Sequence, residues 1–281
     1  MPIERAIRPS GPYSLRLSAR FATDATRRFR GGQLESVLPG GEVARARQRA
    51  DGSVVLAAGS PAGLEQMRFM LAVDDDHSEF LHRFADDPLI GRATRVFKGL
   101  RPARLATVAH ALLRALAGQL VTSRAARDVE RSVVRALSHR EPDTGLCEPP
   151  TAEVLGSSSA AELRRLGLHA RRAAALVRLC RTLDLERLRA APTEAVVRRL
   201  CREPGIGPWS AGVVCLQGLG RYEQGLVGDL GLVKLCSTGG GRVETDETAA
   251  LLEPYEEWAG LASVYILAGL SRGLIPQLRA A

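Results

Sequence analysis

The sequence predicts a mostly α-helical protein in which a small α+β domain precedes a larger all-α domain. Short alternating apolar and polar segments with glycine turns occur in the first 88 residues. After Asp86-Asp87-Pro88, apolar residues recur at helical spacing almost throughout. A chain of 281 residues can also bury two modest cores. We therefore expect one domain over residues 1–88 and a second over residues 89–281.

The first domain is expected to hold a small antiparallel sheet. The alternating segments 13–17 and 53–57 predict strands, and a short helix is expected over 63–71. Turns are expected at Gly31-Gly32, Gly40-Gly41 and Asp51-Gly52, the last being a plausible hairpin turn.

The second domain is expected to be helical from end to end. Ser123, Ser159, Thr193 and either Asp246 or Thr248 can accept hydrogen bonds from free N–H groups at helix starts. The periodicity predicts helices over 105–117, 123–137, 159–166, 169–183, 193–201, 209–219 and 247–258.

Composition favours a soluble protein with a polyanionic partner. Apolar residues make up 45% and charged residues 25%, which is ordinary for a globular chain. The formal net charge is +8 and comes almost wholly from arginine, since Lys98 and Lys234 are the only lysines. Arginine binds phosphates well, but the same residues could simply cover solvated helix faces.

Several classes of site are disfavoured. The five cysteines are widely spaced without a C-x-x-C pair, so we expect neither a zinc site nor disulfides, and a reducing compartment. No signal peptide or membrane span is present, which predicts a cytoplasmic protein, and nothing requires more than a monomer. The run from Asp74 to His77 is interpreted as a solvated turn rather than a metal site. His110 and His169 are expected to be structural and without partners.

A tight turn between two helices is the most informative segment. An arginine-bearing helix meets Pro204-Gly205-Ile206-Gly207, and a second helix begins at once. We expect Gly205 and Gly207 to adopt conformations that a Cβ would forbid. The free N–H groups of the second helix suit a phosphate oxygen. By itself this predicts DNA binding, or only a helix–helix turn.

Asp229 follows the hairpin as an isolated carboxylate between Gly228 and an apolar run. An acid of this kind can be a helix cap or a surface residue. Its place after the hairpin, however, resembles the helix-hairpin-helix (HhH-GPD) DNA glycosylase superfamily, and more narrowly its 3-methyladenine glycosylase II branch. The resemblance covers most of residues 89–270. It includes 113–122, similar to a family segment ending in Gly-Gln-Leu-Val-Ser, and 166–173, similar to a leucine-glycine turn before a basic helix. Before residue 89, only size, α+β character and position match the family's TATA-binding-protein-like domain, by analogy.

The resemblance implies a role for each matching residue. Asp229 is expected to stabilise the positive charge that develops on the sugar as the damaged base departs. Gln119 and Leu120 are expected to push into the duplex, with the leucine filling the gap in the stack. Trp209 and Trp258 match aromatic residues of the base pocket, where an indole stacks on an electron-poor base.

The hairpin residues Pro204, Gly205, Ile206 and Gly207 are expected to hold a DNA phosphate. The family does this partly through a monovalent cation on backbone carbonyls. We expect no other cofactor and no catalytic metal.

Differences from the family narrow the expected activity. Trp209 stands where glycosylase/lyases carry a nucleophilic lysine, which implies a monofunctional enzyme. The four-cysteine iron–sulfur loop is missing after Asp229. Val213 replaces a usual pocket aromatic, and 259–261 is Ala-Gly-Leu where the family tends to have Arg-Ser-Tyr, so the pocket is expected to be wider.

The sequence therefore predicts a monofunctional DNA glycosylase for alkylated bases, 3-methyladenine first among them, that leaves an abasic site. Its expected partner is double-stranded DNA with a flipped damaged base, near the nucleoid, without a membrane or an obligate protein partner. Two alternatives stay open: a DNA-binding or damage-sensing protein without catalysis, and a glycosylase for a different lesion.

Overall fold

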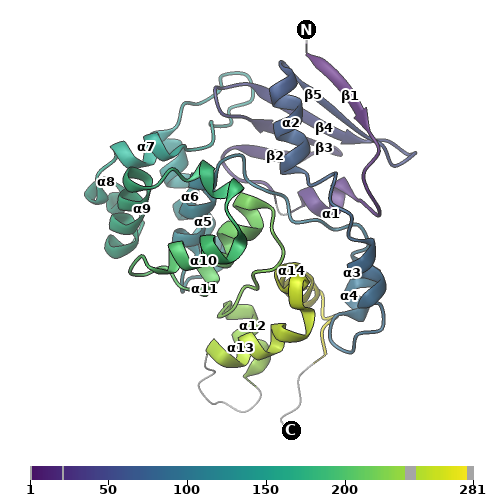
Figure 1. The fold of residues 1–281 in the computed structure, drawn as a ribbon. Helices are drawn as coiled ribbons and strands as arrows, with labels where there is room; N and C mark the ends of the chain where they lie inside the picture. The colour runs from purple at the N-terminus through teal and green to yellow at the C-terminus, as the bar shows by residue number, and fades with distance from the viewer. Residues whose placement is uncertain (1, 21, 238–244, 277–281) are drawn as a thin grey trace.

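A computed structural model describes residues 2–20, 22–237 and 245–276, and shows a sheet beside a larger body of helices (Figure 1). The predicted fold class, mostly α with a small α+β part, is confirmed. The strands are β1 (Ile3–Ile7), β2 (Arg27–Arg30), β3 (Gln33–Val37), β4 (Val43–Gln48) and β5 (Val54–Ala58).

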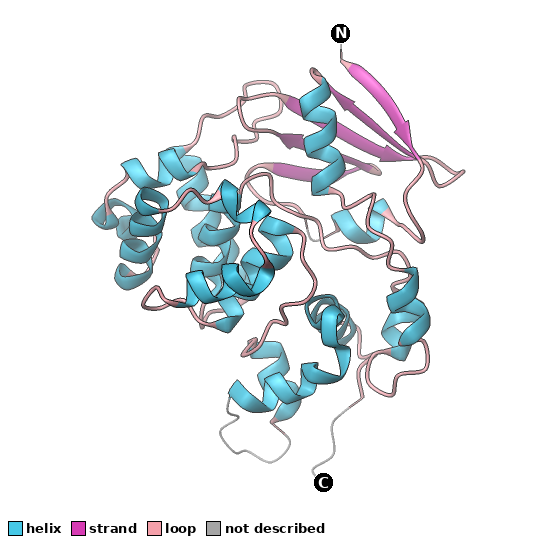
Figure 2. Ribbon diagram, viewed as in Figure 1, coloured by secondary structure: helices cyan, strands magenta, loops and turns pink. Residues whose placement is uncertain are grey.

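The five strands form one antiparallel sheet in the order β1-β5-β4-β3-β2. Helix α2 (Pro61–Met70) crosses one face of this sheet, as Figure 2 shows. Leu34 and Leu56 on that face are buried against Leu64 and Met67 of the helix. The predictions of a strand near 53–57 and a helix near 63–71 are confirmed, and Asp51-Gly52 lies in the turn between β4 and β5.

The predicted strand over 13–17 is wrong. Residues Leu15–Ala19 form a short helix, α1, and the hydroxyl of Ser14 accepts a hydrogen bond from Leu17 N at 3.3 Å. Leu15 and Ala19 are both buried beneath the sheet. Burial at positions four apart is a helical pattern, so tertiary packing overrode the local alternation.

Helices make up most of the rest of the described chain. Residue Ser159 caps its helix as predicted, whereas Thr122 rather than Ser123 caps α6, and α10 has no side-chain cap. In chain order the α-helices are α3 (Ser78–Arg83), α4 (Gly91–Val96), α5 (Val108–Gly118), α6 (Ser123–Leu137), α7 (Ala152–Ser157), α8 (Ala160–Arg165), α9 (Ala170–Thr182), α10 (Thr193–Cys201), α11 (Pro208–Val213), α12 (Leu230–Cys236), α13 (Thr245–Leu252) and α14 (Ala259–Leu270). Short 3₁₀ turns cover Glu186–Ala190 and Glu253–Trp258, and a π-helical turn, Val214–Leu219, continues α11.

Two hydrophobic clusters organise these helices. Helix α5 lies in the first cluster and packs against α6, α9 and α11, while α10 packs against α11. Helix α14 lies in the second, which also takes in Phe80 of α3 and Phe84, just after that helix. Packing with the C-terminal helices therefore begins before residue 88. No helix among the described residues is long and apolar enough to cross a membrane.

Candidate active site

The turn between α10 and α11 has the predicted hairpin form. Gly205 has φ +89°, a left-handed conformation that favours glycine, and open space surrounds the position of its missing Cβ. Ile206 is buried in the first hydrophobic cluster, and this packing holds the turn against the helices. The prediction for Gly207 is wrong: its φ of −105° is open to any residue, and a Cβ there would meet nothing within 4 Å.

The start of α11 offers backbone donors that have no partner among the described residues. Gly207 caps the helix without a side chain, and Pro208 at the first position has no N–H. The first bond back along the helix is Ala211 N to Gly207 O at 3.1 Å, so the N–H groups of Trp209 and Ser210 precede the ladder. Helix α11 and the π-helical turn form one continuous segment. The positive end of its dipole lies at the hairpin turn.

Asp229 and Trp209 are joined directly. The indole Nε1 of Trp209 donates a hydrogen bond to Asp229 Oδ2 at 2.9 Å, and Gly231 N donates to Oδ1 at 2.8 Å. Asp229 is thus both the N-cap of α12 and the partner of the first turn of α11. Both side chains are half-buried. A carboxylate whose two oxygens are each fixed by a donor has a set orientation.

Gly118, at the end of α5, makes room for this tryptophan. A Cβ on Gly118 would lie 2.7 Å from Cη2 of Trp209, closer than side chains approach one another. The requirement for glycine here comes from close packing and not from a left-handed backbone. From sequence, Gly118 has no predicted role of its own, although it lies next to Gln119 in the segment 113–122 that resembles the family.

The loop between α5 and α6 projects outward. Leu120 is 82% exposed and has φ +54°, a conformation that costs a leucine about 1–2 kcal/mol. Gln119 points the other way, since its Nε2 donates to Gly205 O at 2.7 Å and to Ser210 Oγ at 2.8 Å. The structure thus brings together Gln119, the hairpin, Trp209 and Asp229. Sequence reasoning missed Ser210, which is buried and carries no motif of its own.

No family model matches the sequence, and no curated protein matches it. Among solved structures, a 3-methyladenine DNA glycosylase from Archaeoglobus fulgidus has a TM-score of 0.79 at 20% identity, over 96% of this chain and 100% of that chain. An 8-oxoguanine glycosylase/lyase from Clostridium acetobutylicum, solved with double-stranded DNA, has a TM-score of 0.79 at 16% identity, over 98% and 99%.

A third structure is the 3-methyladenine DNA glycosylase of Schizosaccaromyces pombe with abasic DNA. Its TM-score is 0.51 at 17% identity, over 76% of this chain and all of that chain. The chain has the fold of the helix-hairpin-helix DNA glycosylases. In the archaeal and clostridial structures this likeness spans nearly the whole of both chains, so the sheet domain belongs to the shared glycosylase fold.

Within this glycosylase fold, Trp258 lies in an aromatic cluster. Its ring stacks on Tyr222 with centroids 6.1 Å apart and meets Phe80 and His77 at 5.8 and 6.0 Å. Trp209 thus bonds to Asp229, whereas the described ring contacts of Trp258 are all with this cluster. Val213 is buried in the first hydrophobic cluster.

The prediction of a solvated turn from Asp74 to His77 holds for Asp74 and Asp76, which are exposed, and is wrong for His77. His77 is 1% exposed, and its ring meets Tyr222 edge-on at 4.8 Å. Asp75 accepts hydrogen bonds from Tyr222 and Arg104. Burial, with the nearby guanidinium groups of Arg101 and Arg104, lowers the pKa of His77 to about 3, so the ring is neutral. The segment packs the sheet domain against the loop that leads to Asp229.

Asp24, His110 and Glu130 form a compact group of potential metal ligands, with their ligand atoms within 4.8 Å of one another, and Asp24 is half-buried while the other two are buried. The guanidinium of Arg114 already bridges the two carboxylates, at 2.7 Å from each. His110 Nε2 lies 2.7 Å from Glu130 Oε1, so the expectation that this histidine has no partner is wrong. The group is an ion-pair network between the sheet domain and α5 and α6.

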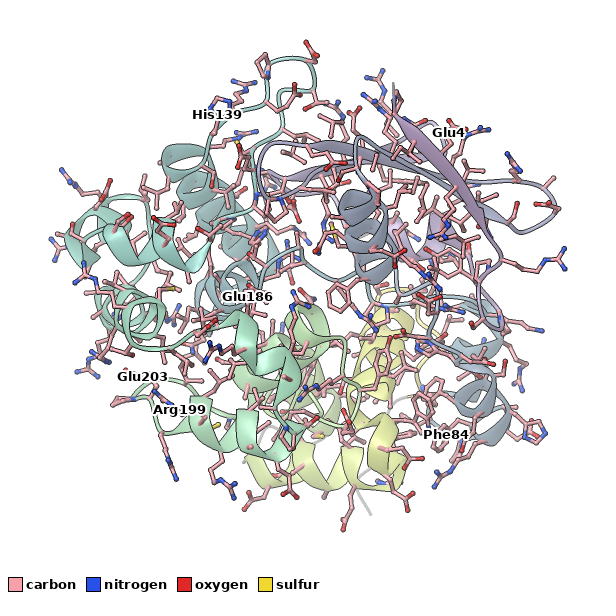
Figure 3. All side chains as sticks on the ribbon, turned by 45° about the horizontal axis from the view of Figure 1, so that its top comes forward. Glu4, Phe84, His139, Glu186, Arg199 and Glu203 are labelled. Carbon is pink, nitrogen blue, oxygen red and sulfur yellow. The ribbon has the colours of Figure 1, made fainter. Side chains whose placement is uncertain are left out.

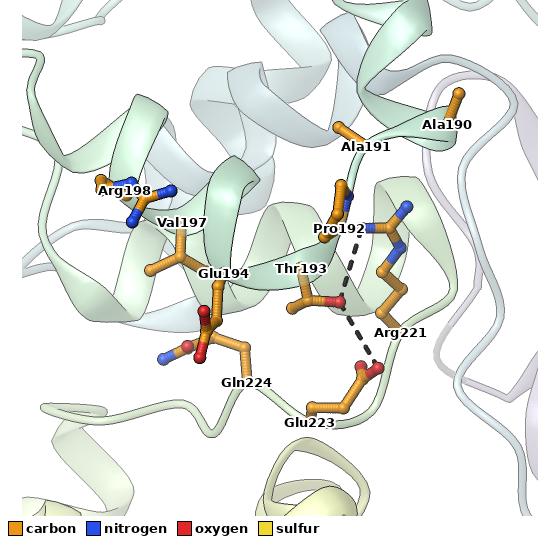
Figure 4. A pocket seen from close by; sticks show the side chains of 10 residues that line it. All are labelled: Ala190, Ala191, Pro192, Thr193, Glu194, Val197, Arg198, Arg221, Glu223 and Gln224. Carbon is orange, nitrogen blue, oxygen red and sulfur yellow. Dashed lines mark hydrogen bonds between the residues drawn. The ribbon is translucent and has the colours of Figure 1, made fainter.

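A separate pocket lies at the start of α10 and holds none of the predicted site residues (Figure 4). Thr193 bonds there to both Arg221 and Glu223, at 3.4 Å each. Charges of both signs line the pocket, which gives it no preference for a phosphate.

Nearby, Figure 3 shows Arg199 and Glu203 on the same side of the molecule, and Arg178 Nε donates to Glu203 at 2.7 Å.

Proposed function

We propose that this protein is a monofunctional DNA glycosylase that excises alkylated bases, with 3-methyladenine the first candidate. The observation that supports it most directly is the hydrogen bond from Trp209 to Asp229, directly beside the hairpin turn. One carboxylate held in place beside an aromatic face is what hydrolysis of an N-glycosidic bond requires when the leaving base is already cationic.

In this proposal the hairpin binds a DNA phosphate. The N–H groups at the start of α11 and the positive end of that helical segment suit the anion. A monovalent cation on backbone carbonyls of residues 200–207 would add to the grip. The carbonyl of Gly205 accepts one hydrogen bond from Gln119, which leaves its second lone pair for such a cation.

The exposed Leu120 is proposed to fill the gap that the flipped base leaves. The base would stack on Trp209, while the Asp229 carboxylate stabilises the positive charge at C1′ and orients a water molecule. Val213 and Trp258 are kept as proposed pocket residues. Trp258 would line the pocket while its ring stacks on Tyr222.

The monofunctional assignment is supported by the residues beside Asp229. Trp209 occupies the first turn of α11, where a lyase would need a nucleophilic amine. Lys98 and Lys234 are both exposed, and neither lies in the hairpin. We therefore propose that water completes the reaction, that the product is an abasic site, and that the protein acts as a monomer near the nucleoid.

The test is release of 3-methyladenine and 7-methylguanine from methylated duplex DNA. Asp229→Asn should lower release by about 100-fold or more while DNA affinity is retained. Asp128→Asn, a change of the same type on the exposed face of α6, should behave as wild type. Strands should stay intact until alkali is added, and strand cleavage without alkali would contradict the monofunctional assignment.

A glycosylase for a different lesion stays the second candidate, because the fold matches an 8-oxoguanine glycosylase/lyase as well as it matches a 3-methyladenine glycosylase. The substrate panel therefore includes 8-oxoguanine, deaminated bases and bulkier alkylated bases. If wild type binds damaged DNA tightly and releases no base from the whole panel, the protein is a damage sensor and the proposal is wrong.

A further inference from the structure

The exposed Leu120 has little packing of its own to hold it in place. It lies in the short connection 119–122 between α5 and α6, is 82% exposed and has φ +54°. A strained conformation persists where surrounding contacts fix it. Contacts of a neighbouring residue must therefore hold the backbone at this position.

Gln119 makes those contacts. Its backbone is extended (φ −62°, ψ 126°) as α5 ends, and its side chain reaches across to the hairpin. The single amide nitrogen donates to Gly205 O at 2.7 Å and to Ser210 Oγ at 2.8 Å. One acceptor lies in the hairpin turn and the other in the first turn of α11, which follows it.

The same contacts connect Leu120 with Asp229. Ser210 is adjacent to Trp209, whose indole donates to Asp229. Gly118, adjacent to Gln119, packs under the same indole. The amide of Gln119 therefore lies between the exposed leucine, the phosphate-binding turn and the helix that positions the carboxylate.

We propose that Gln119 is a positioning residue that fixes Leu120 relative to the hairpin, and is not itself inserted into the duplex. Both donor hydrogens of its amide are used by the hairpin, which leaves no donor for DNA bases. Insertion of the leucine and the grip on the phosphate are thereby kept at one fixed separation. This inference rests on the proposed function, since it assigns Leu120 to the gap left by a flipped base.

The test compares Gln119→Met, which keeps the length of the side chain and removes both hydrogen bonds, with Leu120→Ala. Gln119→Met should lower excision from duplex DNA by about 10- to 30-fold, as expected for two lost hydrogen bonds. Excision from single-stranded DNA carrying the same lesion should change little, because no stack has to be opened. The double variant should be no slower than Leu120→Ala alone, since Gln119 acts through the leucine.

Two results would overturn the inference. Multiplying losses in the double variant would mean that Gln119 contacts DNA on its own account, and equal losses on duplex and single-stranded DNA would mean a general structural role. Thermal unfolding of the DNA-free variants serves as the control, and Gln119→Met should unfold within a few degrees of wild type.

A second readout separates this inference from the proposed function. Duplex DNA with a stable abasic analogue opposite 2-aminopurine reports insertion of a side chain by fluorescence, without any base excision. If wild type releases no base but raises the fluorescence, the proposed function fails and Gln119 can still be judged. Both Gln119→Met and Leu120→Ala should then reduce the signal, and an unchanged signal with Gln119→Met would refute the inference.

Discussion

At the scale of single residues, Trp209 has two separable properties. Its ring provides an apolar face, and its Nε1 donates to the carboxylate of Asp229 at 2.9 Å. Trp258 has the same ring, but its buried Nε1 has no hydrogen-bond partner among the described residues. The two tryptophans therefore provide a matched pair for asking what the donated hydrogen bond does.

We predict that Trp209→Phe lowers excision by about 10-fold or more, because a hydrogen bond to a charged acceptor is lost while an aromatic face remains. Trp258→Phe also keeps an aromatic face but removes an N–H without a partner among the described residues, so its loss of excision should be clearly smaller. Single-turnover rates on methylated duplex DNA provide the measurement. Similar losses in both variants would show that ring size, and not the bond to Asp229, matters.

At the scale of elements, the hairpin depends on one glycine more than on two. Gly205 lies at φ +89°, whereas Gly207 lies in extended backbone at φ −105°. A Cβ added at either position would meet no atom within 4 Å beyond its chain neighbours, so conformation alone distinguishes the two glycines.

We predict that Gly205→Ala destabilises the protein by about 1–2 kcal/mol, since alanine disfavours the left-handed region. Gly207→Ala should cost clearly less, because its backbone angles suit alanine and restriction of the unfolded chain offsets part of the loss of a good N-cap residue. Urea unfolding compares the free energies of unfolding. Equal losses in the two variants would mean that Gly207 has a requirement that its backbone angles do not show.

At the scale of the whole molecule, a buried ion network joins the sheet domain to the helices. Asp24 accepts from Arg27 Nε at 2.9 Å and from Arg114 Nη2 at 2.7 Å, and Arg114 also bonds to Glu130. Burial alone would raise the pKa of Glu130. The adjacent Arg114 guanidinium, together with His110, instead lowers it from 4.5 to about 2. The pKa of Asp24 is lowered as well, against the effect of burial, by Arg27 and Arg114.

A lowered pKa in the folded state sets the sign of the pH dependence. The ionised carboxylate stabilises the fold above its ordinary pKa, and this contribution is lost as pH falls from about 4.5 to about 2. We predict that Glu130→Gln loses about 3–5 kcal/mol at neutral pH, because Arg114 keeps a buried charge with one partner fewer. Its unfolding free energy should also depend less on pH across that window. Glu153→Gln, at an exposed site, is the control and should follow wild type. A Glu130→Gln curve parallel to wild type in acid would contradict this assignment.

Several features of the fold and site were predictable from sequence because they are local. The hairpin at 204–207 and the strand near 53–57 depend on neighbouring residues, and both formed as expected. Asp229 and Leu120 were assigned through motif resemblance, and the structure shows that one is bonded to Trp209 and the other exposed. Their chemical roles stay predictions.

Other features were decided only by tertiary structure. The segment 13–17 alternates like a strand but forms a helix because Leu15 and Ala19 are buried beneath the sheet. His77 and Asp75 lie in a polar run that suggests a solvated turn, yet they meet Tyr222, distant in sequence.

By itself, therefore, the sequence determined the two-part fold class, the hairpin turn and which carboxylate to examine. Only the tertiary structure showed that Gln119 bonds to the hairpin, that Gly118 makes room for Trp209, and that Trp258 packs on Tyr222. The physical reason is that caps, turns and periodicity depend on residues a few positions apart. A side chain's partners depend on which distant elements the packed core brings within hydrogen-bonding distance.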